Sequence, residues 1–146
     1  MTDLLLAVVH HLGMFGIAGV LAVELSIVKP GLGAEGVATV AKVDRLYGAL
    51  AGVMLAAGFS RALFAAKGWD YFAHNGFFWA KIAVFALIGT LSAIPSFKFI
   101  AWRRAADAPG DADVARVRLF IAAQLWLFAL LPVFAAAMAR GHGRFG

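Results

Sequence analysis

The sequence predicts an all-α integral membrane protein, a bundle of four transmembrane helices. Hydrophobic residues make up 63% of the 146-residue chain, charged residues only 14%, and the mean hydropathy is +0.87. Soluble domains are about half apolar and about a quarter charged, so this chain needs lipid to cover its apolar surface. The composition therefore excludes a soluble enzyme. The length fits a single domain over residues 1–146, and the absence of cysteine excludes a disulfide framework and a thiolate metal site.

Long gaps between charges locate the first and last spans. A charge at the bilayer centre costs roughly 2.5 to 3.5 kcal/mol, so spans avoid charges. The gap from Leu4 to Val23 holds 20 uncharged residues, and the gap from Leu119 to Ala139 holds 21. Each gap matches the roughly 20 residues that cross a hydrocarbon core.

The two middle spans are predicted to contain a charge each. The gaps from Leu46 to Ser60 and from Ile82 to Phe97 reach full length only when Arg61 and Lys81 are included. The predicted transmembrane helices are then residues 3–28, 44–66, 76–101 and 114–139.

Turn-forming residues mark the predicted helix ends. The sequence Lys-Pro-Gly at 29–31 ends the first helix, and residues 34–43 form either an interfacial turn or an early start of the second helix. Residues 103–113 are the one soluble connection, with Asp111 or Asp113 placed to cap the fourth helix. The first span has no basic leader, so we expect it to stay as a helix rather than be cleaved.

The distribution of Lys and Arg predicts the orientation in a bacterial inner membrane. Four spans place both termini and the second connection on one face, with five Lys and Arg, against eight on the other face. Basic residues concentrate on the cytoplasmic side, so both termini are predicted outside the cytoplasm, with the aromatic residues of 69–79 at the outer interface. The net charge of +5 then reflects this topology and predicts no nucleic-acid partner.

Five nitrogen-bearing side chains are predicted to meet in or beside one layer of the outer half. At about 1.5 Å per residue, His10 and His11 lie roughly 8 Å outward of the middle of the first helix, and Arg61 and Lys81 lie roughly 9 to 10 Å outward in the second and third. His74, just before the third helix, borders this layer. The sequence supplies no buried carboxylate at this depth, so the cations repel each other unless an anion lies between them. We therefore expect a bound anionic group.

Simpler interpretations remain open for each of these residues. Arg61 and Lys81 lie about five residues from the ends of their spans, so both can also extend to the interface without a ligand. Adjacent histidines on a helix point about 100° apart, so only one of His10 and His11 is expected to face the site.

The inner half contains two further polar signals. Glu24 and Arg45 lie at similar depth in the first two helices, which predicts a structural ion pair in preference to a proton relay. Gln124, near the middle of the fourth helix, is predicted to form an interhelical hydrogen bond.

A haem b suits the outer layer. One imidazole would ligate the iron, and Arg61 and Lys81 would pair with the two propionates. The first candidate for the second axial ligand is His74, followed by Met14, Met138 and His142. A metal site of imidazoles alone, from His10, His11 and His74, is disfavoured because the neighbouring cations oppose a second positive charge.

Four runs of residues carry a resemblance to a known family. They are DRLYG at 44–48, GFSR at 58–61, AKG at 66–68 and above all HNGFFWAK at 74–81. Together with the two adjacent histidines, Glu24 and the ending MARG at 138–141, they resemble a family of small bacterial four-helix membrane proteins known only as a domain of unknown function. The resemblance covers nearly the whole chain.

That family is similar to a superfamily containing CopD-type copper-resistance proteins and HemJ-type protoporphyrinogen oxidases. HemJ-type proteins have an early His in the first helix and a Trp-x-x-Lys start to the third. Here His10 or His11 and, with one residue fewer, Trp79-Ala80-Lys81 resemble them. The resemblance implies a haem b ligand at one histidine and a catalytic role for Lys81.

Three functions follow as hypotheses. The first is an outward-facing cationic pocket for haem b or another anionic apolar molecule, such as a porphyrin or quinone, in electron transfer or porphyrin oxidation. The second is a CopD-like copper or small-solute transport accessory, in which His10, His11, Met14 and Met138 offer ligands to Cu(I). The third is a structural or assembly subunit of a membrane complex, or a homo-oligomer, that packs through the fourth helix.

Overall fold

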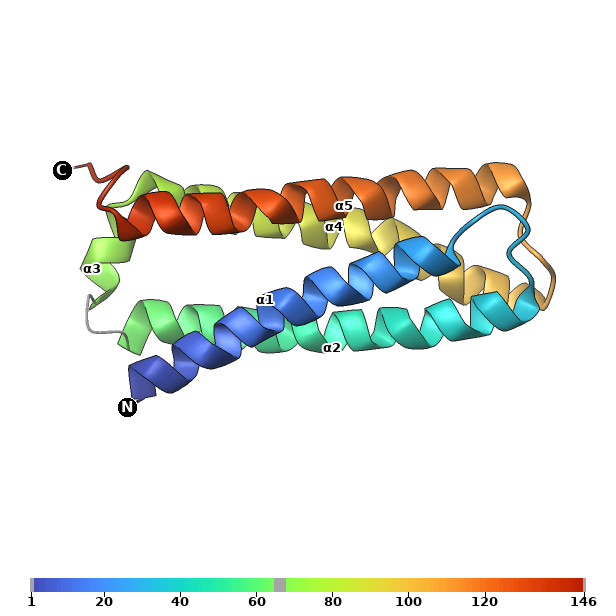
Figure 1. Cartoon of the computed structure of the whole chain (residues 1–146), viewed down its shortest axis with the longest axis horizontal. Coiled ribbons are helices and arrows are strands. Elements are labelled where there is room, and N and C mark those ends of the chain that lie inside the picture. The colour runs from blue at the N-terminus through green and yellow to red at the C-terminus, as the bar shows by residue number, and fades with distance from the viewer. Residues whose placement is uncertain (1, 65–67, 146) are drawn as a thin grey trace.

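Four long helices and one short helix make up the described chain. The computed structural model describes residues 2–64 and 68–145. The long helices are α1 (Thr2–Ile27), α2 (Ala34–Phe64), α4 (Gly76–Ala105) and α5 (Asp111–Ala139), and the short α3 is Gly68–Ala73 (Figure 1). Each long helix has the length and apolar composition of a membrane span. The prediction of four transmembrane helices is confirmed, whereas α3 was not predicted.

The helix ends differ from the predicted ones in a consistent way. α2 begins at Ala34, ten residues before the predicted start, which selects the early-start interpretation of 34–43. Its predicted end at residue 66 lies outside the described residues. α4 continues to Ala105 and α5 begins at Asp111, each a few residues beyond the predicted span. Charges mark where the apolar segment ends, but a helix continues past them into the interface until a turn or cap stops it.

The predicted aspartate cap of the last helix is wrong. The residue that precedes the first turn of α5 is Gly110, and no side chain caps it. Asp111 instead accepts a hydrogen bond from the backbone N–H of Gly31 at 2.9 Å, and Asp113 pairs with Lys98 of α4 at 2.9 Å. Asp111 therefore holds the turn at Gly31 against α5, and Asp113 joins α5 to α4. Neither aspartate caps the first turn of α5.

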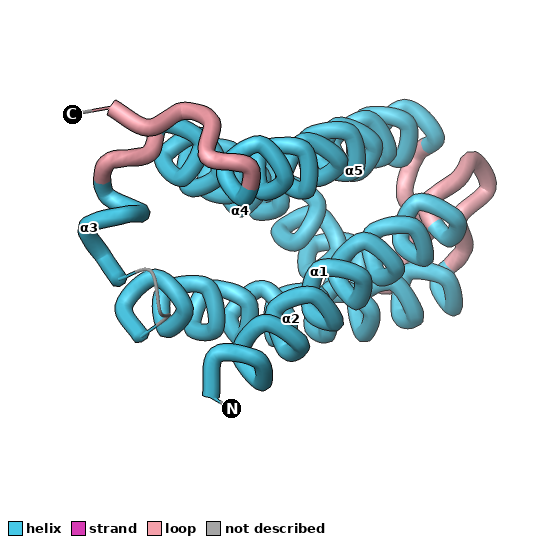
Figure 2. The backbone as a smooth tube through the Cα atoms, turned by 60° about the vertical axis from the view of Figure 1, so that its left-hand side comes forward, coloured by secondary structure: helices cyan, strands magenta, loops and turns pink. Residues whose placement is uncertain are grey.

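The four long helices pair as two antiparallel hairpins. α1 packs along α2 and α4 packs along α5, with smaller contacts between the two pairs. The pairs approach each other at the end that holds the connections 28–33 and 106–110, which we call the loop end (Figure 2). They separate towards the opposite end, the terminal end, where both chain termini and α3 lie.

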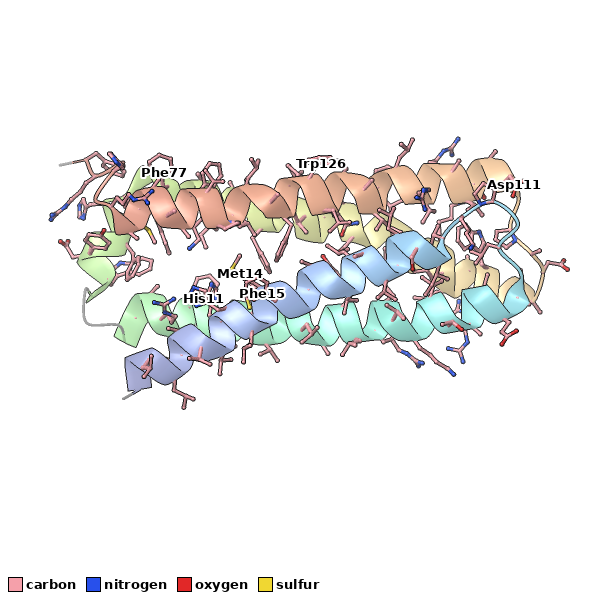
Figure 3. All side chains as sticks on the ribbon, viewed as in Figure 1. His11, Met14, Phe15, Phe77, Asp111 and Trp126 are labelled. Atoms are coloured by element: carbon pink, nitrogen blue, oxygen red, sulfur yellow. The ribbon has the colours of Figure 1, made fainter. Side chains whose placement is uncertain are left out.

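The buried core lies where the hairpins approach, and lipid must cover the outside. Large apolar side chains point outward on several helices, including Phe15, Phe97, Leu119 and Trp126, which are 72% to 78% exposed. Trp126 lies on the outer face of α5 (Figure 3). A helix that is apolar on its outer face as well as its inner face is typical of a membrane span. The protein is therefore a multi-pass membrane protein surrounded by a lipid bilayer.

Hydrogen bonds fasten the terminal end. Asn75 is fully buried: its side-chain oxygen caps α4 by accepting from the N–H of Phe77 at 3.0 Å, and its side-chain amide donates to the carbonyl of His142 at 3.1 Å. The N–H of Gly76 also donates to the carbonyl of Gly143 at 2.8 Å. The segment after α5 is thereby fixed against the start of α4.

Candidate functional site

A cavity of about 140 Å³ lies in the terminal half of the bundle. All five helices contribute to its wall. Most of the lining is apolar and includes four phenylalanines, Phe59, Phe72, Phe78 and Phe85. Two of these, Phe72 and Phe78, belong to the aromatic group predicted at the outer interface, while Trp69 and Trp79 from the same group are exposed.

Three basic side chains from three helices line this cavity. They are His10 of α1, Arg61 of α2 and Lys81 of α4, and all three are partly buried. The ring of His10 lies against Gly58 of α2, where a β-carbon would come within 3.6 Å of the imidazole. The glycine therefore allows the ring to approach α2 closely.

No carboxylate lies in the wall of the cavity, as far as residues 2–64 and 68–145 are concerned. The Nδ1 atom of His10 is buried and has no hydrogen-bond partner. Positive groups that lie close together in an apolar environment repel each other unless an anion or polar molecule lies among them. The structure thus brings His10, Arg61 and Lys81 together at one cavity, as the depth argument predicted for these three, and no carboxylate is part of its described wall.

The other two predicted site histidines lie outside the cavity. His11 is exposed, and its Nδ1 lies 2.6 Å from the carbonyl of Ala7, so this nitrogen donates within α1. His74 is also exposed; its Nδ1 lies 3.2 Å from a carboxylate oxygen of Asp70. Of the two adjacent histidines, His10 is the one directed into the bundle, and the structure does not bring His74 to it as a second ligand.

Three methionines lie in the cavity wall together with His10. Met14 and Met138 were candidate ligands from the sequence, and Met54 of α2 was missed. Met54 lies seven residues before Arg61, which places both on the same face of α2. That spacing is the signal in the sequence that could have identified Met54 as a neighbour of the site.

An apolar groove of about 510 Å³ adjoins the cavity between α1 and α5. Its α5 side consists of small side chains, Ala129, Ala135, Ala136 and Ala139, together with Phe128 and Pro132. Its α1 side includes His11 and Met14, and Met14 also lines the cavity. Figure 3 shows Met14 on the side of α1 that faces α5. Cavity and groove therefore meet at this residue.

The side chains of this site are suitable for binding haem b, but the cavity alone is too small for it. A buried imidazole with an unpartnered nitrogen and three thioethers are haem ligands, and two cations suit the propionates. The cavity volume, however, is close to the roughly 150 Å³ that holds a benzene molecule. Pockets for larger ligands have roughly 300 to 1,000 Å³, so a macrocycle would also need the groove.

The three histidines of the all-imidazole metal hypothesis are not brought together, since His10 lines the cavity whereas His11 and His74 do not. Within the described ranges, no group of three or more His, Asp or Glu residues is arranged to hold a metal ion.

The predicted ion pair between Glu24 and Arg45 is wrong. Glu24 is buried, with 2% exposure, whereas Arg45 is exposed. Arg45 lies at the same depth as Glu24 but on the outward face of α2, so equal depth along the bundle did not imply contact between them. The predicted interhelical hydrogen bond of Gln124 is confirmed, since its Oε1 accepts from the hydroxyl of Tyr47 at 3.3 Å.

The helices and the cavity define a class: a small multi-pass membrane protein with a basic cavity between its helices, in whose described wall no carboxylate lies. The chain matches the family described as "Predicted membrane protein (DUF2214)" over residues 2–143, and it belongs to that family. No curated protein and no solved structure matches it.

Proposed function

We propose that this protein binds an amphiphilic anion within a bacterial inner membrane. The anionic group lies in the cavity with Lys81, Arg61 and His10, and the apolar body extends along the groove between α1 and α5. One observation carries this proposal: three basic side chains from three helices surround a cavity that has no carboxylate in its described wall. Preorganised positive groups of this kind bind anions by charge-assisted hydrogen bonds.

Haem b is the ligand that we propose first. His10 would supply one nitrogen ligand to the iron, and the thioethers of Met14, Met54 and Met138 are the candidates for a second ligand. Arg61 and Lys81 would pair with the propionates, and the phenylalanines of the wall would exclude water. When bound, haem supplies one-electron chemistry to electron transfer or porphyrin oxidation, and Lys81 is then the candidate catalytic residue.

The visible spectrum of the purified protein tests this ligand directly. We expect a sharp Soret band from protein extracted in mild detergent, and we expect the band to be lost in His10→Ala. His74→Ala is the matched control, because this exposed ring bonds with Asp70 and lines neither the cavity nor the groove. A colourless wild-type protein, or a band that both variants keep, would contradict haem ligation by His10.

Copper transport is a second candidate, supported by the three methionines beside His10. Thioethers and imidazoles are suitable ligands for Cu(I). Arg61 and Lys81 oppose this function because they repel a metal cation. A colourless protein that retains about one copper ion, and loses it in Met54→Leu, would favour copper over an anion.

A further inference from the structure

The loop half of the bundle contains a second polar cluster, made of oxygen-bearing side chains. It includes Glu24 of α1, Asp44 and Tyr47 of α2, Ser96 of α4 and Gln124 of α5. The hydroxyl of Ser96 donates to a carboxylate oxygen of Asp44 at 2.6 Å, and the hydroxyl of Tyr47 donates to Gln124. Four separate helices therefore direct polar groups into one region of the membrane.

Glu24 is the unsatisfied member of this cluster. Its side chain is 2% exposed, and its Oε1 atom is buried without a hydrogen-bond partner. The charged group that acts on it electrostatically is the carboxyl of Asp44, which is partly buried. Two acidic groups thus act on each other, with Glu24 closed off from water and Asp44 only partly so.

The cations at this end of the bundle are used elsewhere or point outward. Arg118 of α5 donates to the carbonyls of Leu25 and Val28, and Lys98 of α4 pairs with Asp113. On α2, Arg45 is exposed. Among the described residues, Glu24 therefore forms no salt bridge.

Electrostatic repulsion then limits how many of the two carboxyl groups can be ionised at once. A buried carboxylate without a partner costs several kcal/mol, and two neighbouring carboxylates in an apolar region cannot both stay ionised at low cost. In such a pair one group keeps a proton. Asp44 accepts a hydrogen bond from Ser96, which favours its charged form, whereas Glu24 accepts none at Oε1.

We propose that Glu24 and Asp44 form a carboxyl pair within the membrane that binds one exchangeable proton. The proton resides on Glu24, and it passes to the carboxylate of Asp44 and from there to water at the loop end, without any redox change. Glu24 lies 14 residues from His10 along α1, about 21 Å, so this site is separate from the basic cavity. The proposal therefore does not depend on the ligand of that cavity.

Infrared spectroscopy of the full chain in lipid nanodiscs tests this site. We expect wild-type protein at pH 7 to show the carbonyl band of a protonated carboxyl group, and we expect Glu24→Gln to lose it. Glu35→Gln is the matched control, because Glu35 is exposed in the first turn of α2 at the same end. In heavy water, Asp44→Asn is expected to slow the deuterium shift of the band about tenfold or more, because the variant removes the proton acceptor.

Four outcomes of the infrared experiment would overturn the proposal. They are a wild-type spectrum without the band, a band that persists in Glu24→Gln, a band abolished by excess sodium chloride, which would indicate an alkali-cation site, and a deuterium shift in Asp44→Asn as fast as in wild type. If Glu24→Gln fails to fold, wild-type protein treated with the apolar reagent dicyclohexylcarbodiimide keeps the proposal testable. Mass spectrometry of peptides should then find the label on Glu24 and not on Glu35; an unlabelled Glu24 would overturn the proposal.

Discussion

At the scale of the residue, Lys81 has opposite effects on stability and on binding. Its partly buried ammonium group lies in the same cavity wall as Arg61 and His10, and no carboxylate lies in the described part of that wall. Such an arrangement destabilises the protein without ligand and stabilises the complex with an anion. An ordinary structural lysine would not produce this combination.

Lys81→Met is therefore expected to stabilise the ligand-free protein and weaken haem binding. Replacing a buried charge with an apolar side chain of similar length should raise the free energy of unfolding by about 1 kcal/mol or more. Loss of one charge-assisted hydrogen bond, worth roughly 1.5 to 3 kcal/mol, should weaken haem affinity at least about tenfold. Thermal unfolding and a haem titration in detergent measure the two effects.

The exposed Lys29 at the loop end provides the control, because Lys29→Met changes the same type of side chain far from the cavity. If Lys81→Met destabilises the ligand-free protein while haem affinity stays unchanged, Lys81 has only a packing role.

A seven-residue spacing in the sequence could have predicted which of the two adjacent histidines, His10 or His11, faces inward. In α1, His10, Ile17 and Glu24 are spaced by seven and all face inward, whereas His11 lies outside this series and is exposed. A seven-residue step is close to two helical turns and therefore keeps to one face. This spacing does not predict which residue a side chain will contact. His74, for example, bonds with Asp70 of the short helix α3, which the sequence did not predict.

At the scale of the element, the same seven-residue step relates the inward residues of the other long helices. In α2 it relates Tyr47, Met54 and Arg61; in α4, Lys81, Ile88, Pro95 and Trp102; in α5, Val117, Gln124, Leu131 and Met138. Charge spacing predicted the spans because lipid excludes charge. It could not predict the ends of the helices, which depend on local hydrogen bonds such as that between Gly31 and Asp111.

Arg118 is the residue that joins the two hairpins at the loop end. Its guanidinium, carried by α5, donates to the carbonyls of Leu25 and Val28, the latter at 2.8 Å, at the end of α1. These carbonyls have no partner within a helix that ends at Ile27, and the negative end of the helix dipole favours a cation there.

Arg118→Met should destabilise the protein by about 2 to 4 kcal/mol, because it leaves two carbonyl groups without their donor. Arg116→Met, at an exposed position of the same helix, should change stability by less than about 0.5 kcal/mol. Unfolding in detergent, followed by loss of helical circular dichroism, compares the two variants. Equal stability of both would show that Arg118 does not hold the hairpins together.

At the scale of the whole molecule, orientation decides from which side each polar site is reached. The excess of Lys and Arg on the loop end predicts that this end faces the cytoplasm. The basic cavity would then lie in the outer half of the membrane, and the carboxyl pair would lie near the cytoplasmic side.

The natural absence of cysteine makes this orientation simple to measure. Single cysteines can be introduced at two exposed positions, as His142→Cys at the terminal end and Ala112→Cys at the loop end. A maleimide that does not cross membranes should label only His142→Cys in cells whose inner membrane is intact, and both variants after permeabilisation. Labelling of Ala112→Cys alone in intact cells would reverse the orientation.

The central claim is that the basic cavity holds an amphiphilic anion, and native mass spectrometry of protein released from bacterial membranes tests it most directly. We predict an adduct of one such molecule per chain in the wild-type protein and its loss in the double variant Arg61→Met with Lys81→Met. A wild-type protein without this adduct, or an adduct that the double variant retains, would contradict the claim.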